Sequence, residues 1–507
     1  MMKKVVVIVL SLAFICYTLS MVLADSTNGR LENTQDELKL GVEVLLDEQK
    51  ELIEGKRVGL ITNPTGVDQA LNSIVDRLHN DPAVNLTALY GPEHGVRGDA
   101  QAGEYVEYYI DEQTGLPVYS LYGETRKPTP EMLENVDVLL FDIQDVGARF
   151  YTYIYTMAYA MEAAQENGKE FIVLDRPNPL GGYDVGGPVL DPDYASFVGN
   201  YPIPLRHGLT VGELANLFNE EFAIGADLKV VEMNGWERGM YYNDTNLEFV
   251  MPSPNMPTLD TALVYPGAAL IEGTNVSEGR GTTKPFELIG APFINSTEFA
   301  QALNELEVPG VLFRAASFTP MFSKHSGTLT HGVQIHVIDK EAYQPVITGL
   351  HIVKAIHDMY PDEFAFRAEN SSGISFFDNL IGNGWVREAI ENGDAVEEMV
   401  ITWNQELERF KQTRRNYLLY KILVDNMQAA VDRFTESGAI EEAAKRKLTM
   451  HLTAVAQYEK KGQADKVRKH MKGFKLLLDQ QKDSQRIVEE AYSYLMKQAN
   501  DMIKQWQ

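Results

Sequence analysis

Cysteine is nearly absent from this chain. Of its 507 residues only Cys16 carries a thiol, and it lies within an apolar stretch near the amino terminus. A single cysteine forms no internal disulfide, and if the apolar stretch is a leader removed on export, the mature protein has no thiol nucleophile either. The fold must therefore rest on ordinary core packing, which a hydrophobic content of 44% permits.

Several catalytic motifs are missing as well. The sequence contains no GxSxG nucleophile elbow, no HExxH pair and no clustered cysteine–histidine spacing, and no GxGxxG follows the first candidate strand. These absences disfavour a serine-elbow hydrolase, a bound metal, and dinucleotide binding through the common Gly-rich motif. We expect no metal and no cofactor.

Positive charge is scarce over most of the chain. The 45 Lys and Arg residues face 72 Asp and Glu residues, and the net charge of −27 disfavours nucleic acid as a partner. Residues 412–507 reverse this balance with 18 basic and 12 acidic residues, which leaves 27 basic and 60 acidic residues for the rest. The tail is therefore a different module.

The amino terminus has the pattern of a secretory leader. A positive MMKK precedes an apolar run from Val5 to Leu23, and the segment ending at Ala24 offers a small-residue cleavage site. We expect a signal peptide over residues 1–24, a secreted or extracytoplasmic location, and a polar linker over residues 25–39. The apolar run is somewhat long for a leader, so an uncleaved anchor is the alternative.

Apolar runs and helix-like stretches alternate over residues 40–258. Fully apolar strands separated by helices are typical of a mostly parallel sheet that is covered on both faces. The pattern predicts a Rossmann-like α/β domain. The expected strands lie within 57–66, 84–95, 116–123, 136–145 and 170–179, and the expected helices include 69–79 and 152–167.

Two further modules follow. Residues 259–411 mix Gly-rich loops with candidate strands at 311–318 and 332–339 and candidate helices at 345–359 and 393–409, which predicts a smaller α/β domain that completes a cleft. Residues 412–507 contain no proline, and apolar residues recur at helical spacing from Leu419 to Val431. This region predicts a bundle of three or four amphipathic helices.

Polar residues stand at the carboxyl ends of the predicted strands. In the segment LYGPEHGVRG (89–98) a strand ends at Gly91-Pro92, and Glu93 and His94 follow at once. Carboxyl ends of parallel strands meet at one edge, where open α/β sheets bind ligands. Loops are polar for other reasons too, but the whole set favours a concave polar site. The other residues of the set are Asn63, Tyr122, Asp142, Gln144, Asp145, Asp175, Arg176 and Asn178.

A second polar segment, residues 272–292, is rich in glycine, which lets backbone N–H groups approach a ligand closely. The order of residues in this segment is not that of a P-loop, which disfavours a phosphate site. Paired carboxylates beside hydroxyls suit sugar recognition better, and glycoside cleavage generally uses two carboxyl groups. Candidate ligands here are Glu272, Asn275, Glu278, Arg280 and Thr282. Further candidates are Asn255 in a Pro-framed turn and Arg206 and His207, which precede a helix with an expected capping box of Thr210 and Glu213.

Together these segments resemble a known family. The motifs GPEHG (91–95), DIQDVGARFYTY (142–153), DRPNPLGG (175–182), RHGLTVGE (206–213), PSPNMPT (252–258) and EGTNVSEGRGT (272–282) occur in the order of the bacterial exo-β-N-acetylmuramidases, and the similarity spans roughly residues 40–410. The resemblance implies a Rossmann-like domain paired with a smaller one. It also implies release of N-acetylmuramic acid from the non-reducing end of peptidoglycan fragments, with Glu93 as the catalytic residue. We expect Glu93 to act as general acid, oriented by His94.

The partners of Glu93 are less defined. We expect Asp142 and Glu278 to join it in catalysis, while Asp145, Glu272 or the acetamido group of the substrate are alternatives for the second group. The lactyl carboxylate of muramic acid calls for a cation, preferably a bidentate one, and Arg280 is favoured over Arg149, Arg176 and Arg206. For Arg149 an internal ion pair with Asp145 is an equal alternative. The remaining expected substrate ligands are Asn63, His94, Gln144, Asn178, His207, Asn255, Glu272, Asn275 and Thr282.

Residues from about 417 onward resemble the small helical domain called FIMAH. The basic balance of this tail would favour an anionic cell-wall polymer, and a role as a spacer or stability module is an equal alternative. Two other functions compete with the muramidase hypothesis for the whole chain. One is a wall-binding protein without turnover, and the other is a peptide or ester hydrolase, which the missing serine elbow, thiol and metal motif disfavour.

Overall fold

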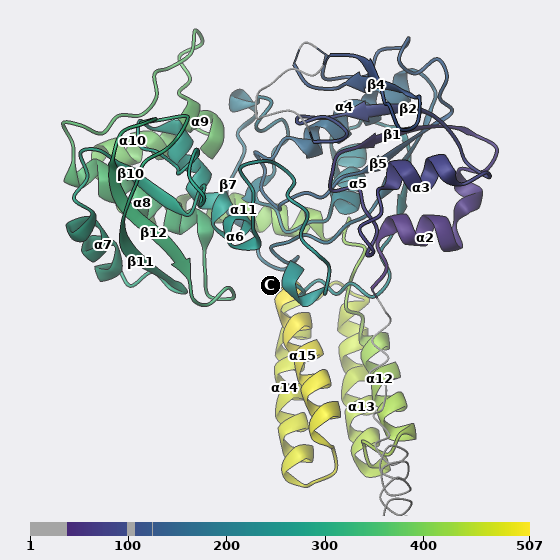
Figure 1. Cartoon of the computed structure of the whole chain (residues 1–507). Helices are drawn as coiled ribbons and strands as arrows, with labels where there is room; N and C mark the ends of the chain where they lie inside the picture. Colours follow the sequence, from purple (N-terminus) through teal and green to yellow (C-terminus); the bar gives the residue numbers. More distant parts are fainter. Residues whose placement is uncertain (1–37, 99–106, 124, 507) are drawn as a thin grey trace, which may run out of the picture. The chain divides into compact units, whose positions relative to one another are not determined.

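The structure is a computed structural model that describes residues 38–98, 107–123 and 125–506 (Figure 1). The signal peptide expected over residues 1–24 and nearly all of the expected linker lie outside the described residues. Over the ranges that are described, none of the helices combines the length and the apolar character needed to cross a bilayer.

The first domain is built on a seven-stranded sheet with the strand order β3-β4-β2-β1-β5-β6-β9. All neighbouring strands run parallel except the edge pair β3 and β4. Each of the five predicted apolar runs contains one strand, so the predicted mostly parallel sheet is confirmed, while β3 and β9 were not expected. The strands are β1 Arg57–Thr62, β2 Asn85–Gly91, β3 Tyr109–Ile110, β4 Pro117–Ser120, β5 Val138–Asp142, β6 Glu170–Leu174 and β9 Asp227–Val231.

The sheet is covered on both faces. Every residue of β5 is buried, which a strand in a half-exposed sheet would not show. Helices α4 and α5 pack on each other and on β6 and β9. Helix α2 also packs on β6 and β9, and α3 packs on β2. The expected capping box at α5 is present, with Thr210 Oγ1 accepting from Glu213 N at 3.3 Å. The helices are α2 Gly41–Glu48, α3 Ile74–Asn80, α4 Tyr153–Glu166 and α5 Val211–Glu221, with short 3₁₀ turns η1 Lys50–Leu52, η2 Pro192–Tyr194 and η3 Tyr242–Asp244.

A two-stranded hairpin and a second, antiparallel sheet complete the part of the chain that precedes the helical tail. The hairpin pairs β7 Gly186–Val189 with β8 Pro204–Arg206, and the second sheet has the order β10-β12-β11. Its strands are β10 Leu288–Ala291, β11 Val311–Phe318 and β12 Thr330–Val337. The helices here are α6 Leu259–Ala268, α7 Ser296–Glu305, α8 Pro345–Met359, α9 Phe376–Ile381, α10 Trp385–Asn392 and α11 Val396–Arg414, with the 3₁₀ turn η4 Ala269–Gly273.

Helix α11 runs five residues beyond the predicted end at residue 409. Its last residue, Arg414, is buried and donates hydrogen bonds to the carbonyl oxygens of Gly182, Tyr183 and Gly208. These contacts hold the final turn of the helix against the first domain. Because their partners are more than 200 residues away in the sequence, local periodicity did not reveal them.

The tail folds into four helices with a hydrophobic core of their own (Figure 1). Met427 and Val431 are buried in this core, as their spacing predicted, but the helix begins only at Val424, so the helical spacing expected from Leu419 onward is wrong for the residues before it. Three hydrogen bonds from the preceding segment reach the first domain: Tyr417 to Glu221, the Leu419 amide to Glu213, and Tyr420 to Asp175. The four helices are α12 Val424–Glu436, α13 Glu442–Glu459, α14 Ala464–Asp483 and α15 Glu489–Gln505.

Candidate active site

Glu93 lies in a tight turn directly after β2. The Gly95 amide donates to the Pro92 carbonyl at 3.0 Å, and His94 adopts a left-handed backbone with φ of 76°. A Cβ added at Gly91 would lie only 3.0 Å from the Val96 nitrogen, so the turn is too close for a side chain there. A left-handed backbone is costly for a residue such as histidine and persists only where the surroundings enforce it. The position of Glu93 is therefore fixed by the backbone around it.

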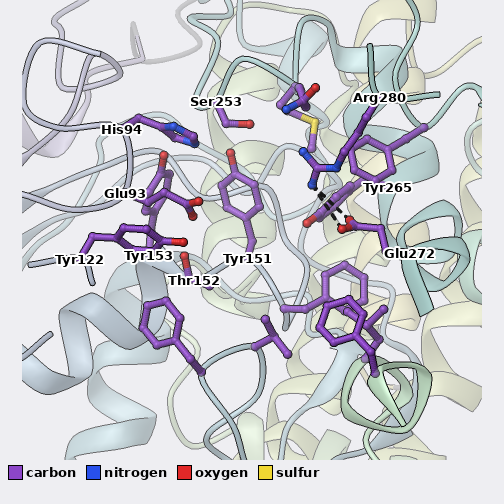
Figure 2. Close-up of a pocket in the computed structure, with 18 residues that line it drawn as sticks. Glu93, His94, Tyr122, Tyr151, Thr152, Tyr153, Ser253, Tyr265, Glu272 and Arg280 are labelled. Atoms are coloured by element: carbon purple, nitrogen blue, oxygen red, sulfur yellow. Dashed lines mark hydrogen bonds and ion pairs between the residues drawn. The ribbon is translucent and has the colours of Figure 1, made fainter. Parts of the chain in front are cut away.

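Glu93 faces a cavity of about 190 Å³ that both domains line (Figure 2). The first domain contributes the turn after β2, Tyr122 after β4, and the loop that leads into α4. The second contributes Tyr265 from α6, Glu272 from η4 and Arg280 from the Gly-rich segment. The remaining lining residues are His94, Phe150, Tyr151, Thr152, Tyr153, Phe197, Val198, Ser253, Asn255, Met256, Phe286, Phe376 and Leu380.

Neutral phenols surround Glu93. Tyr122 is hydrogen-bonded to Glu93, and burial, together with the Glu93 charge, raises the pKa of Tyr122 to about 12. Burial likewise raises the pKa of Tyr151 and Tyr153, whose rings meet edge-to-face with centroids 5.0 Å apart. These hydroxyls stay protonated near neutral pH. Tyr153 donates to the Pro252 carbonyl, whereas Tyr122 and Tyr151 can donate to a carboxylate or to sugar oxygens.

The opposite wall carries a network of two carboxylates and two cations. Arg280 reaches Glu272 at 3.3 Å and Glu278 at 3.4 Å. Lys324 binds Glu278 at 2.9 Å and also donates to the carbonyl oxygens of Ile271 and Val276. Lys324 thus fixes the segment on both sides of Glu272, while Glu272 and Arg280 themselves line the cavity.

Glu272 has a perturbed acidity. Burial raises its pKa, the nearby Glu278 raises it further, and Arg280 and Lys324 oppose both effects. Perturbed carboxyl groups in a concave site are typical of acid–base catalysis. Figure 2 shows Glu272 and Arg280 on one side of the cavity and Glu93 on the other, with Tyr151 between them.

The structure places six of the sequence-predicted site residues around this cavity and the others outside its lining. Glu93, His94, Tyr122, Asn255, Glu272 and Arg280 line it. The sequence suggested that the strand-end residue Glu93 and the Gly-rich segment face a common hollow, and in the structure both line the same cavity. The roles of the individual residues stay predictions.

Several predicted residues at the strand ends bind one another. Asp142 is fully buried and forms an ion pair of 2.5 Å with Arg176, which also donates to the Val67 carbonyl. The side-chain oxygen of Asn63 accepts from the Thr65 hydroxyl at 2.6 Å, and that hydroxyl accepts from the backbone amide of Gln144 at 2.9 Å. These contacts join the loops after β1, β5 and β6 into one rigid edge.

A second group of predicted residues holds the loops behind the cavity. Asn178 donates to the Leu209 carbonyl, and Arg206 donates to the Leu180 carbonyl and lies 3.5 Å from Asp184. His207 accepts from the Leu209 amide through Nδ1, and its Nε2 lies 3.3 Å from the Asp145 carboxylate. All three residues are buried.

Arg149 is fully buried, and its guanidinium donates to the carbonyl oxygens of Pro188, Ile203 and Leu380. Its partners are backbone groups rather than Asp145, the ion-pair partner considered from the sequence. Burial lowers the pKa of Arg149 to about 10. The side chain therefore joins the β7–β8 hairpin to α9.

The last predicted residues belong to the Gly-rich segment itself. Asn275 donates to the Glu363 carbonyl and accepts from the Ala365 amide. Thr282 donates to the Gly279 carbonyl at 2.6 Å. Both side chains therefore fix the shape of the segment that carries Glu272 and Arg280.

Sequence reasoning missed the aromatic wall. Tyr265 stands edge-to-face to Phe150, Tyr151 and Phe286, with centroids 5.2, 5.7 and 4.8 Å apart. Aromatic rings suit the apolar C–H faces of a sugar. The run RFYTY (149–153) was a usable signal, because it places three aromatic residues in the loop between the central strand β5 and helix α4.

The site gives no sign of a metal centre. Within the described ranges no three His, Cys, Asp or Glu side chains come together as a metal-binding group. The carboxylates at the cavity are instead compensated by Arg280 and Lys324. The arrangement can therefore bind a sugar-sized ligand between two carboxyl groups, with hydroxyl and guanidinium donors around it.

Comparison with known proteins gives consistent matches. Residues 58–260 match the family model described as exo-β-N-acetylmuramidase NamZ, N-terminal, and residues 263–420 match the corresponding C-terminal model. Residues 424–504 match the FIMAH domain. The chain is 63% identical over 383 residues to the peptidoglycan β-N-acetylmuramidase NamZ of Bacillus subtilis (strain 168), covering 76% of this chain and 91% of that protein.

Two solved structures of DUF1343 family proteins from Bacteroides fragilis NCTC 9343 share the fold. One has a TM-score of 0.70 and 42% identity, and the other a TM-score of 0.62 and 32% identity. Each alignment covers 76% of this chain and 99% of the other.

Proposed function

Because the chain belongs to the exo-β-N-acetylmuramidase family, it is a glycoside hydrolase that removes terminal N-acetylmuramic acid from peptidoglycan fragments, and we propose that Glu93 is its general acid. The observation that carries the proposal is the cavity: its lining includes two carboxyl groups, Glu93 and Glu272, one from each domain. Two carboxyl groups flanking the bond to be cleaved are what most glycoside hydrolases use.

Glu93 donates its proton to the glycosidic oxygen as the bond from that oxygen to the anomeric carbon breaks. The leaving sugar departs with the proton, and a water molecule supplies the hydroxyl that finally occupies the anomeric carbon. The rigid turn after β2 supports this role, because a general acid must be held within hydrogen-bond reach of one particular oxygen. Tyr122, bonded to Glu93, fixes the direction of the carboxyl group.

We infer that Glu272 is the second group. Among the four carboxylates considered from the sequence, Asp142 is in an ion pair with Arg176 and Asp145 faces His207, whereas Glu272 lines the cavity. Glu278 has an indirect role, because its ion pairs hold Arg280 and Lys324 of the opposite wall in place. Glu272 works from the opposite wall, either on the incoming water or on the acetamido group of the substrate.

Arg280 is the proposed ligand of the lactyl carboxylate. It lines the cavity and stacks on Phe286, with its guanidinium carbon 5.1 Å from the ring centroid. Its contacts to Glu272 and Glu278, at 3.3 and 3.4 Å, are longer than a close charge-assisted bond, so a substrate carboxylate can compete for the same guanidinium.

Export and wall association complete the proposal. The leader pattern of residues 1–24 supports a location outside the cytoplasm, where peptidoglycan fragments arise. The basic balance of residues 412–507 supports contact of the helical tail with an anionic wall polymer. Pelleting with isolated walls at low and high salt, with the full chain and with a chain ending at residue 421, tests this role, and equal pelleting of both proteins would contradict it.

The catalytic proposal is tested with the substitution Glu93→Gln. A chromogenic β-glycoside of N-acetylmuramic acid should be turned over at least about 100-fold more slowly, because the amide cannot donate the proton. Thermal unfolding should be close to that of the parent, since the backbone rather than the side chain builds the turn. Near-normal turnover by a folded variant would remove Glu93 from its assigned role, and lack of turnover by the parent protein would favour a wall-binding protein.

A further inference from the structure

The side-chain amide of Asn255 is open to the catalytic cavity and has no partner there. Asn255 lines the cavity and is only 7% exposed. Within the described ranges no residue forms a hydrogen bond with its side-chain amide, yet neither the oxygen nor the nitrogen is sealed from solvent as the amide nitrogen of Asn63 is. Polar side chains that are buried to this degree rarely lack a partner without a reason. This amide therefore points to a ligand in the cavity.

The turn that carries Asn255 is fixed in place. The Met256 amide donates to the Ser253 carbonyl at 3.0 Å, which closes the turn around Asn255. The Tyr153 hydroxyl donates to the carbonyl of Pro252 and so joins the turn to the start of α4. Ser253, which opens the turn, lines the same cavity (Figure 2). A binding group that is already held in position loses little entropy when a ligand arrives.

The other groups of the cavity show which part of the sugar this amide suits. Among the described residues that line the cavity, Asn255 carries the only side-chain amide. The lactyl carboxylate is drawn to the cation of Arg280, and Tyr122 and Tyr151 offer hydroxyls to the ring oxygens. The acetamido group at C2 combines a neutral carbonyl acceptor with a methyl. Met256 follows Asn255, is 1% exposed and lines the cavity, so an amide donor and an apolar side chain stand together as that group requires.

We propose that Asn255 recognises the acetamido group of the substrate and thereby selects an N-acetylated sugar. The amide nitrogen donates to the acetamido carbonyl oxygen, and the acetamido methyl packs on Met256. A hydroxyl at C2 has no methyl for Met256 and is a poorer match for this part of the wall. The inference rests on the proposed function, because it takes N-acetylmuramic acid as the sugar in the cavity, but it does not depend on the role of Glu93.

The test compares two sugars that differ only at C2: N-acetylmuramic acid, and 3-O-lactylglucose, which has a hydroxyl in place of the acetamido group. Isothermal titration calorimetry with the full chain gives the dissociation constant of each sugar. We expect the parent to bind N-acetylmuramic acid at least about tenfold more tightly, because a site built to hydrogen-bond one group rejects an analogue without it. Asn255→Ala should weaken mainly the binding of N-acetylmuramic acid and bring the two constants within about twofold of each other. Asn404→Ala, exposed on α11 and outside the cavity lining, is the matched control and should keep the preference of the parent.

Two results would overturn the role of Asn255: equal binding of both sugars by the parent, or an unchanged preference in the Asn255→Ala variant. If that variant fails to fold, Asn255→Asp replaces it, because aspartate keeps the size and the acceptor but has no amide donor. A preference equal to that of the parent would then count against the role. A parent that binds neither sugar and does not turn over the chromogenic glycoside would overturn the proposed function itself, and this inference with it.

Discussion

The hydroxyl of Tyr420 donates a hydrogen bond of 2.6 Å to the carboxylate of Asp175, one residue beyond the end of β6. Asp175 is fully buried and also accepts from the Thr210 hydroxyl and the Gly212 amide. Burial raises the pKa of Asp175 to about 7, against the effect of these hydrogen bonds. The segment before the helical bundle is thus tied to the central sheet through one phenol.

Removing that phenol oxygen should destabilise the protein. Tyr420→Phe leaves Asp175 with one donor fewer in a buried place, and we expect the free energy of unfolding to fall by about 1–3 kcal/mol. The matched control is Tyr492→Phe, whose hydroxyl binds Asp479 on the bundle at 2.8 Å and whose loss should change stability by less than about 0.5 kcal/mol. Urea unfolding of both variants measures the difference, and equal shifts would show that the Tyr420 contact contributes nothing special.

Glu272→Gln should lower turnover without unfolding the protein. If Glu272 is the second carboxyl group, kcat on the chromogenic muramic acid glycoside should fall about 100-fold or more. Glu305→Gln on the exposed side of α7 serves as control and should leave the rate unchanged. A Glu272→Gln variant with normal kcat would assign the second role to the acetamido group of the substrate alone.

Arg280→Ala should change which sugars the enzyme accepts. A charge-assisted bond to the lactyl carboxylate is worth about 10- to 100-fold in kcat/KM for the muramic acid glycoside. The corresponding N-acetylglucosamine glycoside lacks that carboxylate, so kcat/KM for that glycoside should fall much less. Arg280→Lys should give an intermediate loss, because a lysine keeps the charge but not the two-pronged geometry. An equal fall for both glycosides would mean that Arg280 serves only to hold Glu272 and Glu278.

Asp501→Asn should stabilise the protein near neutral pH. Burial, reinforced by Glu237 and opposed by Lys497, raises the pKa of Asp501 to about 6. The folded protein therefore prefers the neutral carboxyl, and ionisation costs stability progressively as the pH rises from about 4 to 6 and fully above that. We expect the variant to gain about 1–3 kcal/mol over the parent at pH 7 and almost nothing at pH 4.

Urea unfolding of parent and Asp501→Asn at pH 4, 5.5 and 7 gives the comparison. Lys497 lies 3.7 Å from Asp501, and if this ion pair outweighs burial, the variant will instead be less stable at pH 7. That reversed sign would contradict the prediction.

The centre of the sheet was predictable because its strands are buried on both faces, whereas the more exposed edge strands β3 and β9 were not expected. The residues of β5 read as one apolar run, and Gly91-Pro92 marked the end of β2, so the place of Glu93 at the sheet edge followed from local sequence. The lining of the catalytic cavity was only partly predictable. A polar residue at a strand end can bind a ligand or a neighbouring loop, and the sequence does not distinguish Glu93 from Asp142, which binds Arg176.

Long-range partners account for most of what the sequence could not show. Tyr265 reads as a core residue of α6, and only the fold brings it beside Tyr151. Lys324 lies on the connection between β11 and β12, far from the Gly-rich segment it fixes.

The anchoring of the α11 terminus by Arg414 has a practical consequence for dissecting the enzyme. Deleting everything from residue 412 would remove the Arg414 donor from three backbone carbonyls, of which only those of Gly182 and Gly208 keep a donor in Arg238, and would expose the surface that Arg414 fills. Loss of activity in such a shortened protein would then result from damage to the catalytic domains and would not show that the helical bundle contributes to activity. A chain that ends at Lys421 keeps Arg414, Tyr417 and Tyr420, so any change in its activity can be attributed to the missing bundle.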